Sequence, residues 1–408
     1  MDFIPQLLLL QDNEDEDLLL AALASLLLIS IDEARRLRNA CRNPSHRYLC
    51  RPQLLPSPRH NTPWQRLYAS RDDRAFITTM GFNVETFHTL LVSGFEMEWE
   101  GLPIDRTDVS RAGAPRLHAR SLDAAGALGL VLHYLSSAMQ EVGLQQIFAL
   151  IPATVSRYLK FSMPILLNSL RTMPEAEIRW PTGDEFHEDN ALIVARHPRL
   201  LGAFGSADGL GLAVQEADDA EAENATYNGW KSSHFINNIL AFSPQGVIIH
   251  ATLNAPGSWH DAHTARPLFE KLYTSTPDNF YLVTDTAFPR SAVSIAGKIR
   301  APLKTGQRVE GTAAEQDETL TFNRELLSYR QTAEWGMRAM QGGFARLRVP
   351  LDINDSEGRR ALLELCCRLH NVRAVCIGIN QIRSVYMPTW QAIEGKEIWS
   401  RLEILADE

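Results

Sequence analysis

The sequence lacks several features that mark secreted, membrane-spanning or nucleic-acid-coating proteins. It has five cysteines, an odd number, and no Cys-x-x-Cys pair, which disfavours a disulfide framework and indicates a reducing, intracellular compartment. The net charge is −9, which argues against a protein that binds nucleic acid over its whole surface. The sequence also has no Lys/Arg-rich cluster of the kind that directs nuclear import. Any contact with DNA is therefore expected from local basic patches or through a partner.

Long apolar runs are also missing. The one candidate for a membrane segment, Leu18–Ile31, is shorter than the roughly 18 residues that a span needs. It follows an acidic stretch, whereas a signal peptide begins with a basic one. We therefore expect an amphipathic or buried helix and no membrane association, with the arginines at 35, 36 and 38 at its C-terminal end, where cations suit the helix dipole.

The chain does contain enough apolar residues for real hydrophobic cores. With 408 residues, 45% of them hydrophobic, it is long enough for two or three domains. Prolines between positions 52 and 58 and the Trp180-Pro181-Thr182 stretch mark boundaries. The expected parts are an N-terminal helix and Pro/Arg-containing linker (1–65), a helical domain (66–180), an α/β domain (200–375) and a C-terminal extension (376–408).

The periodicity of apolar residues predicts the main helices and strands. Ser243-Pro244-Gln245-Gly246 fits a type I turn between two of the strands. The acidic run over 216–223 is expected to be a solvated loop. Helices are predicted over Asp72–Leu91, Ser121–Ala138, Arg266–Tyr273 and Arg324–Gln341, and strands over Phe235–Phe242, Val247–Leu253 and Phe280–Thr284.

One pair of short helices has helix-turn-helix spacing. Gly143–Leu150 is followed by a break and then by Ile151–Lys160, which has proline in its first turn. Arg157 and Lys160 would point away from the apolar face of the second helix and be free to meet phosphates. An ordinary hairpin of a helical bundle fits the same residues equally well.

Three acidic residues stand out by their surroundings. Asp208 lies in Gly-Ser-Ala-Asp-Gly, Asp285 ends an apolar run, and Glu334 lies within a predicted helix. Carboxylates that converge repel one another unless a metal neutralises them, and hard oxygen ligands suit Mg²⁺ or Mn²⁺. If the three converge, the pattern predicts a two-metal phosphoryl-transfer site.

Each of these residues also has a structural alternative. Asp208 fits a turn before a glycine, and Asp285 fits a helix N-cap. Glu334 fits an exposed ion-paired stripe, because Arg330 and Arg338 lie four residues to either side.

Asp261 and a group of basic residues complete the candidate site. Asp261 either caps a helix, the interpretation we favour, or serves as an auxiliary metal-binding carboxylate. His260 and His263 have no further ligand at zinc spacing, and Cys366, Cys367 and His370 look like helix core. The candidate phosphate contacts near the carboxylates are Lys231, Lys304, Arg338, Arg346 and Arg348.

A series of sequence blocks resembles the PIF/Harbinger-type transposases of the DDE endonuclease superfamily, in a variant common in fungi. The resemblance covers roughly Gly202–Asn371. At Ala287 and Phe288 the sequence differs from the residues most frequent in the family, which are glycine and tyrosine. Neither position is a candidate metal ligand. The blocks, in the family's order, are Ser206-Ala207-Asp208-Gly209, Tyr227-Asn228-Gly229-Trp230-Lys231, Pro256-Gly257-Ser258-Trp259-His260-Asp261, Thr284-Asp285-Thr286-Ala287-Phe288-Pro289, Phe322-Asn323 with Arg330 and Glu334, and Leu369-His370-Asn371.

This resemblance implies an RNase H-like α/β catalytic domain, a mixed sheet flanked by helices, preceded by an α-helical region with a helix-turn-helix-like segment. It implies a nuclease that binds two divalent cations through Asp208, Asp285 and Glu334 and cleaves DNA, with strand transfer at transposon ends. Expected partners are DNA at terminal repeats and target sites, a Myb-like DNA-binding protein and further copies of the chain. The expected location is the nucleus, or the cytoplasm until a partner carries the protein in.

Two other functions remain open at this point. A domesticated, non-catalytic protein could keep the fold for DNA or protein binding. An RNA-cleaving enzyme on the same fold would need contacts to 2′-hydroxyls, which the sequence does not reveal.

Overall fold

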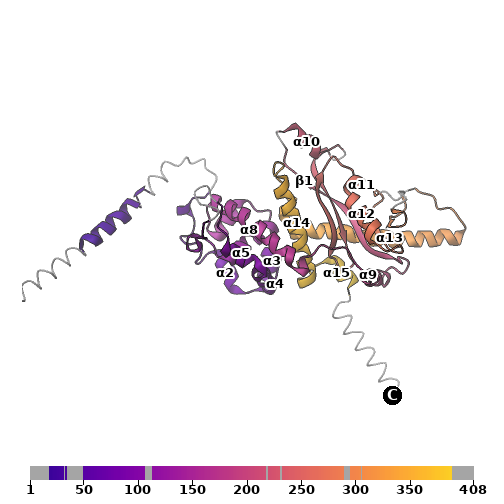
Figure 1. The fold of residues 1–408 in the computed structure, drawn as a ribbon, viewed down its shortest axis with the longest axis horizontal. Helices are drawn as coiled ribbons and strands as arrows, with labels where there is room; N and C mark the ends of the chain where they lie inside the picture. Colours follow the sequence, from indigo (N-terminus) through magenta and orange to yellow (C-terminus); the bar gives the residue numbers. More distant parts are fainter. Residues whose placement is uncertain are drawn as a thin grey trace, which may run out of the picture. The chain divides into compact units, whose positions relative to one another are not determined.

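The computed structural model describes residues 18–31, 33–34, 49–105, 113–216, 219–229, 232–288, 295–304 and 306–387 (Figure 1). The chain divides into two compact units, Met1–Leu49 and Cys50–Glu408. In the first unit, residues 18–31 form the expected helix. Its leucines are exposed, so of the two expected forms, amphipathic or buried, the buried one is wrong. Among the described helices, none is both long and apolar enough to cross a membrane. The arginines at 35, 36 and 38 lie outside the described residues.

The second unit begins with a helical region. Four of its helices start at side chains that accept a hydrogen bond from the first turn: Thr62, Asp72, Asn83 and Asp123. Trp64 and Phe148 stack at a centroid distance of 5.4 Å in its core. The helices are α2 (Pro63–Ser70), α3 (Asp73–Met80), α4 (Val84–Leu90), α5 (Glu96–Gly101), α6 (Ala124–Ser136), α7 (Glu141–Phe148) and α8 (Pro152–Thr172).

Two sequence predictions change in this region. The helix predicted over Asp72–Leu91 is two helices, because Gly81 ends α3 in the left-handed conformation (φ 84°) and Asn83 caps α4. The predicted pair α7 and α8 is present, but α8 has 21 residues and continues through Pro164. It packs on α6 and α7 and, far along the chain, on α14 (Ser356–Val372). A helix-turn-helix function for this pair stays a prediction.

The following α/β region is built on a six-stranded mixed sheet. The strand order is β2-β3-β1-β5-β6. β4 also pairs with β3, along Ile236–Phe242, whereas β2 pairs with Ser233 and His234. β1 pairs antiparallel with β3 and parallel with β5. The predicted hairpin between β3 and β4 is confirmed, with Gly246 N–H donating to the carbonyl of Ser243 at 2.9 Å. The strands are β1 (Ala203–Ala213), β2 (Tyr227–Asn228), β3 (Ser233–Phe242), β4 (Ile248–Pro256), β5 (Tyr281–Thr284) and β6 (Ile299–Arg300).

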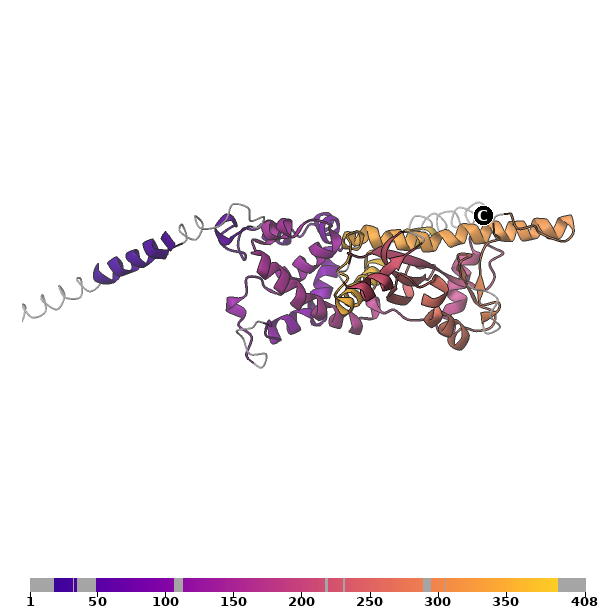
Figure 2. The same ribbon diagram turned by 90° about the horizontal axis from the view of Figure 1, so that it is seen from above.

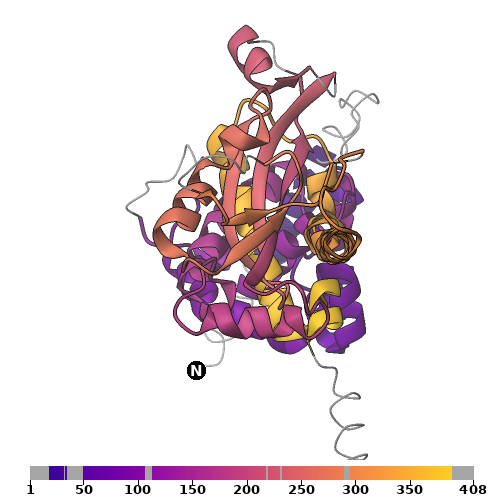
Figure 3. The ribbon, with the colours of Figure 1, turned by 90° about the vertical axis from the view of Figure 1, so that its right-hand side faces the viewer.

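Different helices cover the two faces of this sheet. Strand residues alternate between faces, so Ser206, Asp208 and Leu210 of β1 share one face. That face meets α13 (Ala313–Gly343), whereas α9 (Glu185–Val194) and α12 (Arg266–Ser275) pack on the other. Figure 3 shows α13 end-on beside the sheet, and Figure 2 shows its length.

Three elements of the α/β region differ from the predictions. α9 was not predicted, and it brings Phe186 against Phe204 at the start of β1. α13 begins at Ala313, earlier than predicted, because Thr312 and Glu315 form a reciprocal capping box. The acidic run is also not a loop in its second half, because α10 (Ala220–Thr226) starts there with Asp219 as its cap.

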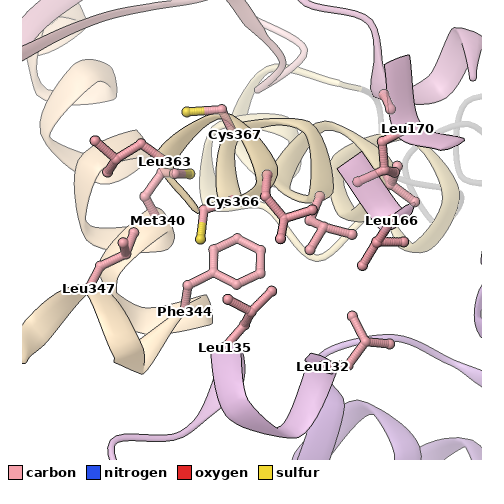
Figure 4. Close-up of a cluster of buried hydrophobic side chains, with 14 of the residues drawn as sticks. Leu132, Leu135, Leu166, Leu170, Met340, Phe344, Leu347, Leu363, Cys366 and Cys367 are labelled. Atoms are coloured by element: carbon pink, nitrogen blue, oxygen red, sulfur yellow. The ribbon is translucent and has the colours of Figure 1, made fainter. Parts of the chain in front are cut away.

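The helical region and the α/β region share one hydrophobic core (Figure 4). Leu132 and Leu135 of α6 and Leu166 of α8 lie in the same buried cluster as Met340 and Cys366 of α13 and α14. As expected, Cys366, Cys367 and His370 are buried in α14.

Candidate active site

Asp208 lies in the middle of β1 and Asp285 directly follows β5, which places two of the predicted carboxylates side by side. Ala207 pairs with Thr284 in parallel register, so Asp208 and Asp285 are the next residues on two adjacent strands. The Asp208 Oδ1 accepts a hydrogen bond from Gly209 N–H at 2.7 Å, and Asp285 Oδ1 accepts from the Thr286 hydroxyl at 3.2 Å. Both carboxyls are half-buried. Asp208 is a strand residue that pairs with Leu240 of β3, so the turn that we considered as its alternative is wrong. The N-cap considered for Asp285 involves residues 289–294, which lie outside the described part of the chain.

The helix α13 is fixed against the same face of the sheet. The hydroxyls of Thr332 and Ser206 lie 2.6 Å apart, both buried. Gly336 allows the ring of Phe242 to pack on the helix, because a Cβ there would lie 2.5 Å from the ring. Glu334, between these two contacts in sequence, is held near the strand that carries Asp208.

Glu334 also takes part in the predicted ion-paired stripe. Its Oε1 lies 2.8 Å from Arg330 Nη2, and its Oε2 lies 3.9 Å from Arg338 Nη2. The Arg338 side chain is 76% exposed, so that second contact contributes little. The alternative interpretation of Glu334 is thus realised.

The three carboxylates share one electrostatic environment. Burial raises the pKa of Asp208 to about 6, the Asp285 and Glu334 carboxylates add to the rise, and the Gly209 amide and Arg330 oppose it. Nevertheless, the described residues contain no group of three or more His, Cys, Asp or Glu side chains placed to hold a metal. The carboxylate oxygens of Asp208 and Asp285 are the donors that Mg²⁺ and Mn²⁺ prefer, while Glu334 would have to exchange Arg330 for a metal.

The raised pKa of Asp208 predicts a pH-dependent stability. A carboxyl whose pKa is higher in the folded state favours folding at low pH, and this contribution is lost as the pH rises through about 6. We expect Asp208→Asn to increase the unfolding free energy of the metal-free protein at pH 8 by up to about 3 kcal/mol, with a higher melting temperature, and to change both little at pH 4. Thermal unfolding in EDTA measures this. The exposed Asp317 on α13 supplies the control Asp317→Asn, which should show no such pH dependence.

Asp261 lies near β1 but beside its opposite face. The N-cap of α11 (Asp261–Thr264) is His260, so Asp261 is the first helical residue and our favoured cap assignment is wrong. A methyl group built on Gly209 would lie 3.4 Å from an Asp261 carboxylate oxygen. Because Gly209 and Asp208 face opposite sides of the sheet, this places Asp261 away from the α13 face.

The predicted basic residues are spread over several places. Lys231 lies outside the described residues, and Lys304 and Arg348 are exposed. Arg346 lies 4.5 Å from the ring centroid of Tyr134 in α6, which links the helical and α/β regions. A structural contact therefore occupies that arginine, and Arg346 also lines a hollow of about 360 Å³ together with Lys160.

Sequence reasoning missed a concentration of arginines beside Arg157. Arg116, the buried Arg120 and Arg157 line a pocket of about 220 Å³ that has no acidic residue in its lining. The Tyr158 hydroxyl accepts a hydrogen bond from Ser121 N–H at 2.7 Å and joins the two segments that carry these arginines. No short motif connects positions so far apart in the chain, so the signal appears only in the folded structure.

Comparison with known proteins gives one match. Residues 207–371 match the family model described as DDE superfamily endonuclease. The match supports a DDE transposase family, and the mixed sheet flanked by helices fits an RNase H-like DDE domain. Enzymes of this superfamily generally use divalent metal ions. Searches of curated proteins and of solved structures found no match.

Proposed function

We propose that this protein is a metal-dependent DNA endonuclease of the PIF/Harbinger type, which cleaves DNA at transposon ends. The observation that carries the proposal is the position of Asp208 in β1 beside Asp285, which directly follows the adjacent parallel strand β5, on the sheet face that packs against the helix carrying Glu334. The family match spans all three residues. The proposed location is the nucleus, with a Myb-like protein as partner.

In this proposal Asp208, Asp285 and Glu334 hold two divalent cations. When bound, such ions activate a nucleophile and stabilise a leaving oxygen in phosphodiester cleavage. Arg330 holds the Glu334 carboxylate beside the cluster until the site is filled. Asp208 must lose its proton to bind a cation, and burial raises its pKa in the metal-free protein, so metal binding and cleavage should increase as the pH rises.

Arginines at two places supply candidate contacts for DNA phosphates. Arg338 lies on α13 one turn beyond Glu334, with its side chain 76% exposed. In the helical region, the pocket of Arg116, Arg120 and Arg157 offers a second cationic surface. Phosphate contacts of this kind position a duplex without reading its sequence.

A cleavage assay tests this function. Labelled duplex DNA carrying the flanking terminal repeats is incubated with the full chain and a Myb-like partner in Mg²⁺, in Mn²⁺ and in EDTA. We expect nicking in either metal, none in EDTA, and none by Asp285→Ala in any buffer. If DNA or partner binding persists without cleavage in both proteins, the domesticated, non-catalytic alternative replaces the enzyme. Full activity of Asp285→Ala would refute the proposed site.

A further inference from the structure

Arg373 is a cationic side chain enclosed where three parts of the fold meet. It follows the last residue of α14 and begins a π-helical turn, Arg373–Ile377. A Cβ built on Gly343, at the end of α13, would lie 1.8 Å from its Nη1. A Cβ built on Gly81, at the end of α3, would lie 3.5 Å from its Nε. Two glycines thus make room for the guanidinium and fix its position.

This guanidinium has no anionic partner among the described residues. It forms no ion pair and no side-chain hydrogen bond, and its Nε is buried without an acceptor. Its guanidinium carbon lies 5.8 Å from the centroid of the Phe344 ring. Burial lowers the pKa of Arg373, and no carboxylate opposes that effect. A cation left unpaired in such a place is costly, and an anion would relieve that cost.

A pocket opens beside Arg373. Its volume is about 220 Å³, and the residues lining it include Gly342, Gly343, His370 and Gln381. None of its lining residues is acidic. His370 is held neutral, since burial lowers its pKa to about 4, and its Nε2 lies 3.1 Å from the Gly246 carbonyl. The Arg373 guanidinium is therefore the one full charge that this pocket presents.

We propose that this pocket binds a phosphate group, with Arg373 as its principal ligand. A guanidinium presents a planar set of N–H donors that matches phosphate oxygens, and the glycines hold it in place beforehand. Phosphate bound there would also stabilise the junction of α13, α14 and the helical region, because Arg373 touches all three. The site does not depend on the proposed endonuclease function.

One other source of negative charge lies nearby. α13 ends at Gly343, and the last carbonyls of a long helix carry partial negative charge. If these carbonyls already satisfy Arg373, added phosphate should have no specific effect.

Thermal unfolding of the full chain in inorganic phosphate, against chloride at equal ionic strength, tests the site. We expect a saturable rise in melting temperature of about 2–4 °C for the wild type. The rise should be absent in Arg373→Met and kept in Arg360→Met, which removes an exposed arginine of α14.

A second variant keeps the test valid if Arg373→Met does not fold. Gln381→Glu places a carboxylate in the pocket lining, so it should raise the melting temperature without phosphate and abolish the phosphate response. A phosphate response equal to that in chloride, or one that persists in Gln381→Glu, would overturn the proposal.

The source of the phosphate group is distinguished by DNA binding. If a duplex competes with phosphate and binds Gln381→Glu several-fold more weakly than wild type, the site takes a phosphate of the nucleic acid backbone. If phosphate binds but duplex affinity is unchanged, it takes free phosphate. Because neither readout involves cleavage, failure of this site and failure of the endonuclease proposal are separate results.

Discussion

Replacing Glu334 by glutamine is expected to lower the rate of metal-dependent DNA cleavage by roughly 10³-fold, comparable to removing a key charge-stabilising group from an active site. The amide has nearly the same volume and keeps the helix, but it brings no negative charge to the cations that Asp208 and Asp285 would hold. Single-turnover cleavage of a labelled duplex measures the effect. Glu334 is the informative residue because its carboxylate is ion-paired with Arg330 in the structure.

Two further variants distinguish a catalytic role of Glu334 from a purely structural, ion-pairing role. Glu318→Gln makes the same chemical change at an exposed position of α13 and should leave the rate unchanged. Arg330→Gln frees Glu334 and should alter the rate far less than Glu334→Gln. If Glu334 serves only to form ion pairs with Arg330 and Arg338, then Glu334→Gln will lower the melting temperature slightly and leave the cleavage rate unchanged.

Asn371→Ala is expected to cause the largest loss of stability, about 3–5 kcal/mol. The fully buried Asn371 side chain accepts a hydrogen bond from Ile248 N–H at 2.8 Å. Its amide donates to the carbonyls of Ile248 at 3.0 Å and Glu177 at 2.7 Å. Removing the amide leaves three backbone groups without these partners, at the edge strand β4 and at the segment that precedes α9.

Denaturant unfolding measures this loss, with Asn354→Ala at an exposed position as the control. A loss below about 1 kcal/mol for Asn371→Ala would show that water or neighbouring groups replace the side chain. Asn371 closes the Leu-His-Asn block, so this result would give that block a structural meaning, since His370 also contacts the β3–β4 turn at Gly246.

The fold was predictable where one physical signal dominates. The buried strand before Asp285 and the hairpin at Ser243–Gly246 follow from apolar alternation and turn chemistry, and both are confirmed. The split at Gly81 and the early start of α13 were missed although their signals, a glycine C-cap and a capping box, are present in the sequence. Apolar periodicity outweighed these shorter signals in the prediction.

The candidate site was predictable in a narrower sense. We predicted carboxylates at the ends of two apolar strands, and β1 and β5 do bring Asp208 beside Asp285, although Asp208 lies in the middle of β1. Helical spacing fits both a ligand and an ion-paired role for Glu334, and the structure realises the pair with Arg330. The Arg346 contact with Tyr134 and the isolation of Arg373 depend on packing between distant segments, which no local pattern encodes.

The shared core of α6, α8, α13 and α14 has a consequence for how such a protein would measure distance along DNA. Leu135, Leu166 and Cys366 belong to one buried cluster, so in the part of the chain that the structure describes a shared core joins the helical region, with its arginines, to the sheet, with its carboxylates. A duplex held on the first surface would meet the second at a constant number of base pairs. The shared core would thus set the distance between the DNA-binding surface and the cleavage site. The cavity left by Leu166→Ala should loosen that core, so we expect a wider distribution of cleavage positions on the duplex while cleavage itself continues.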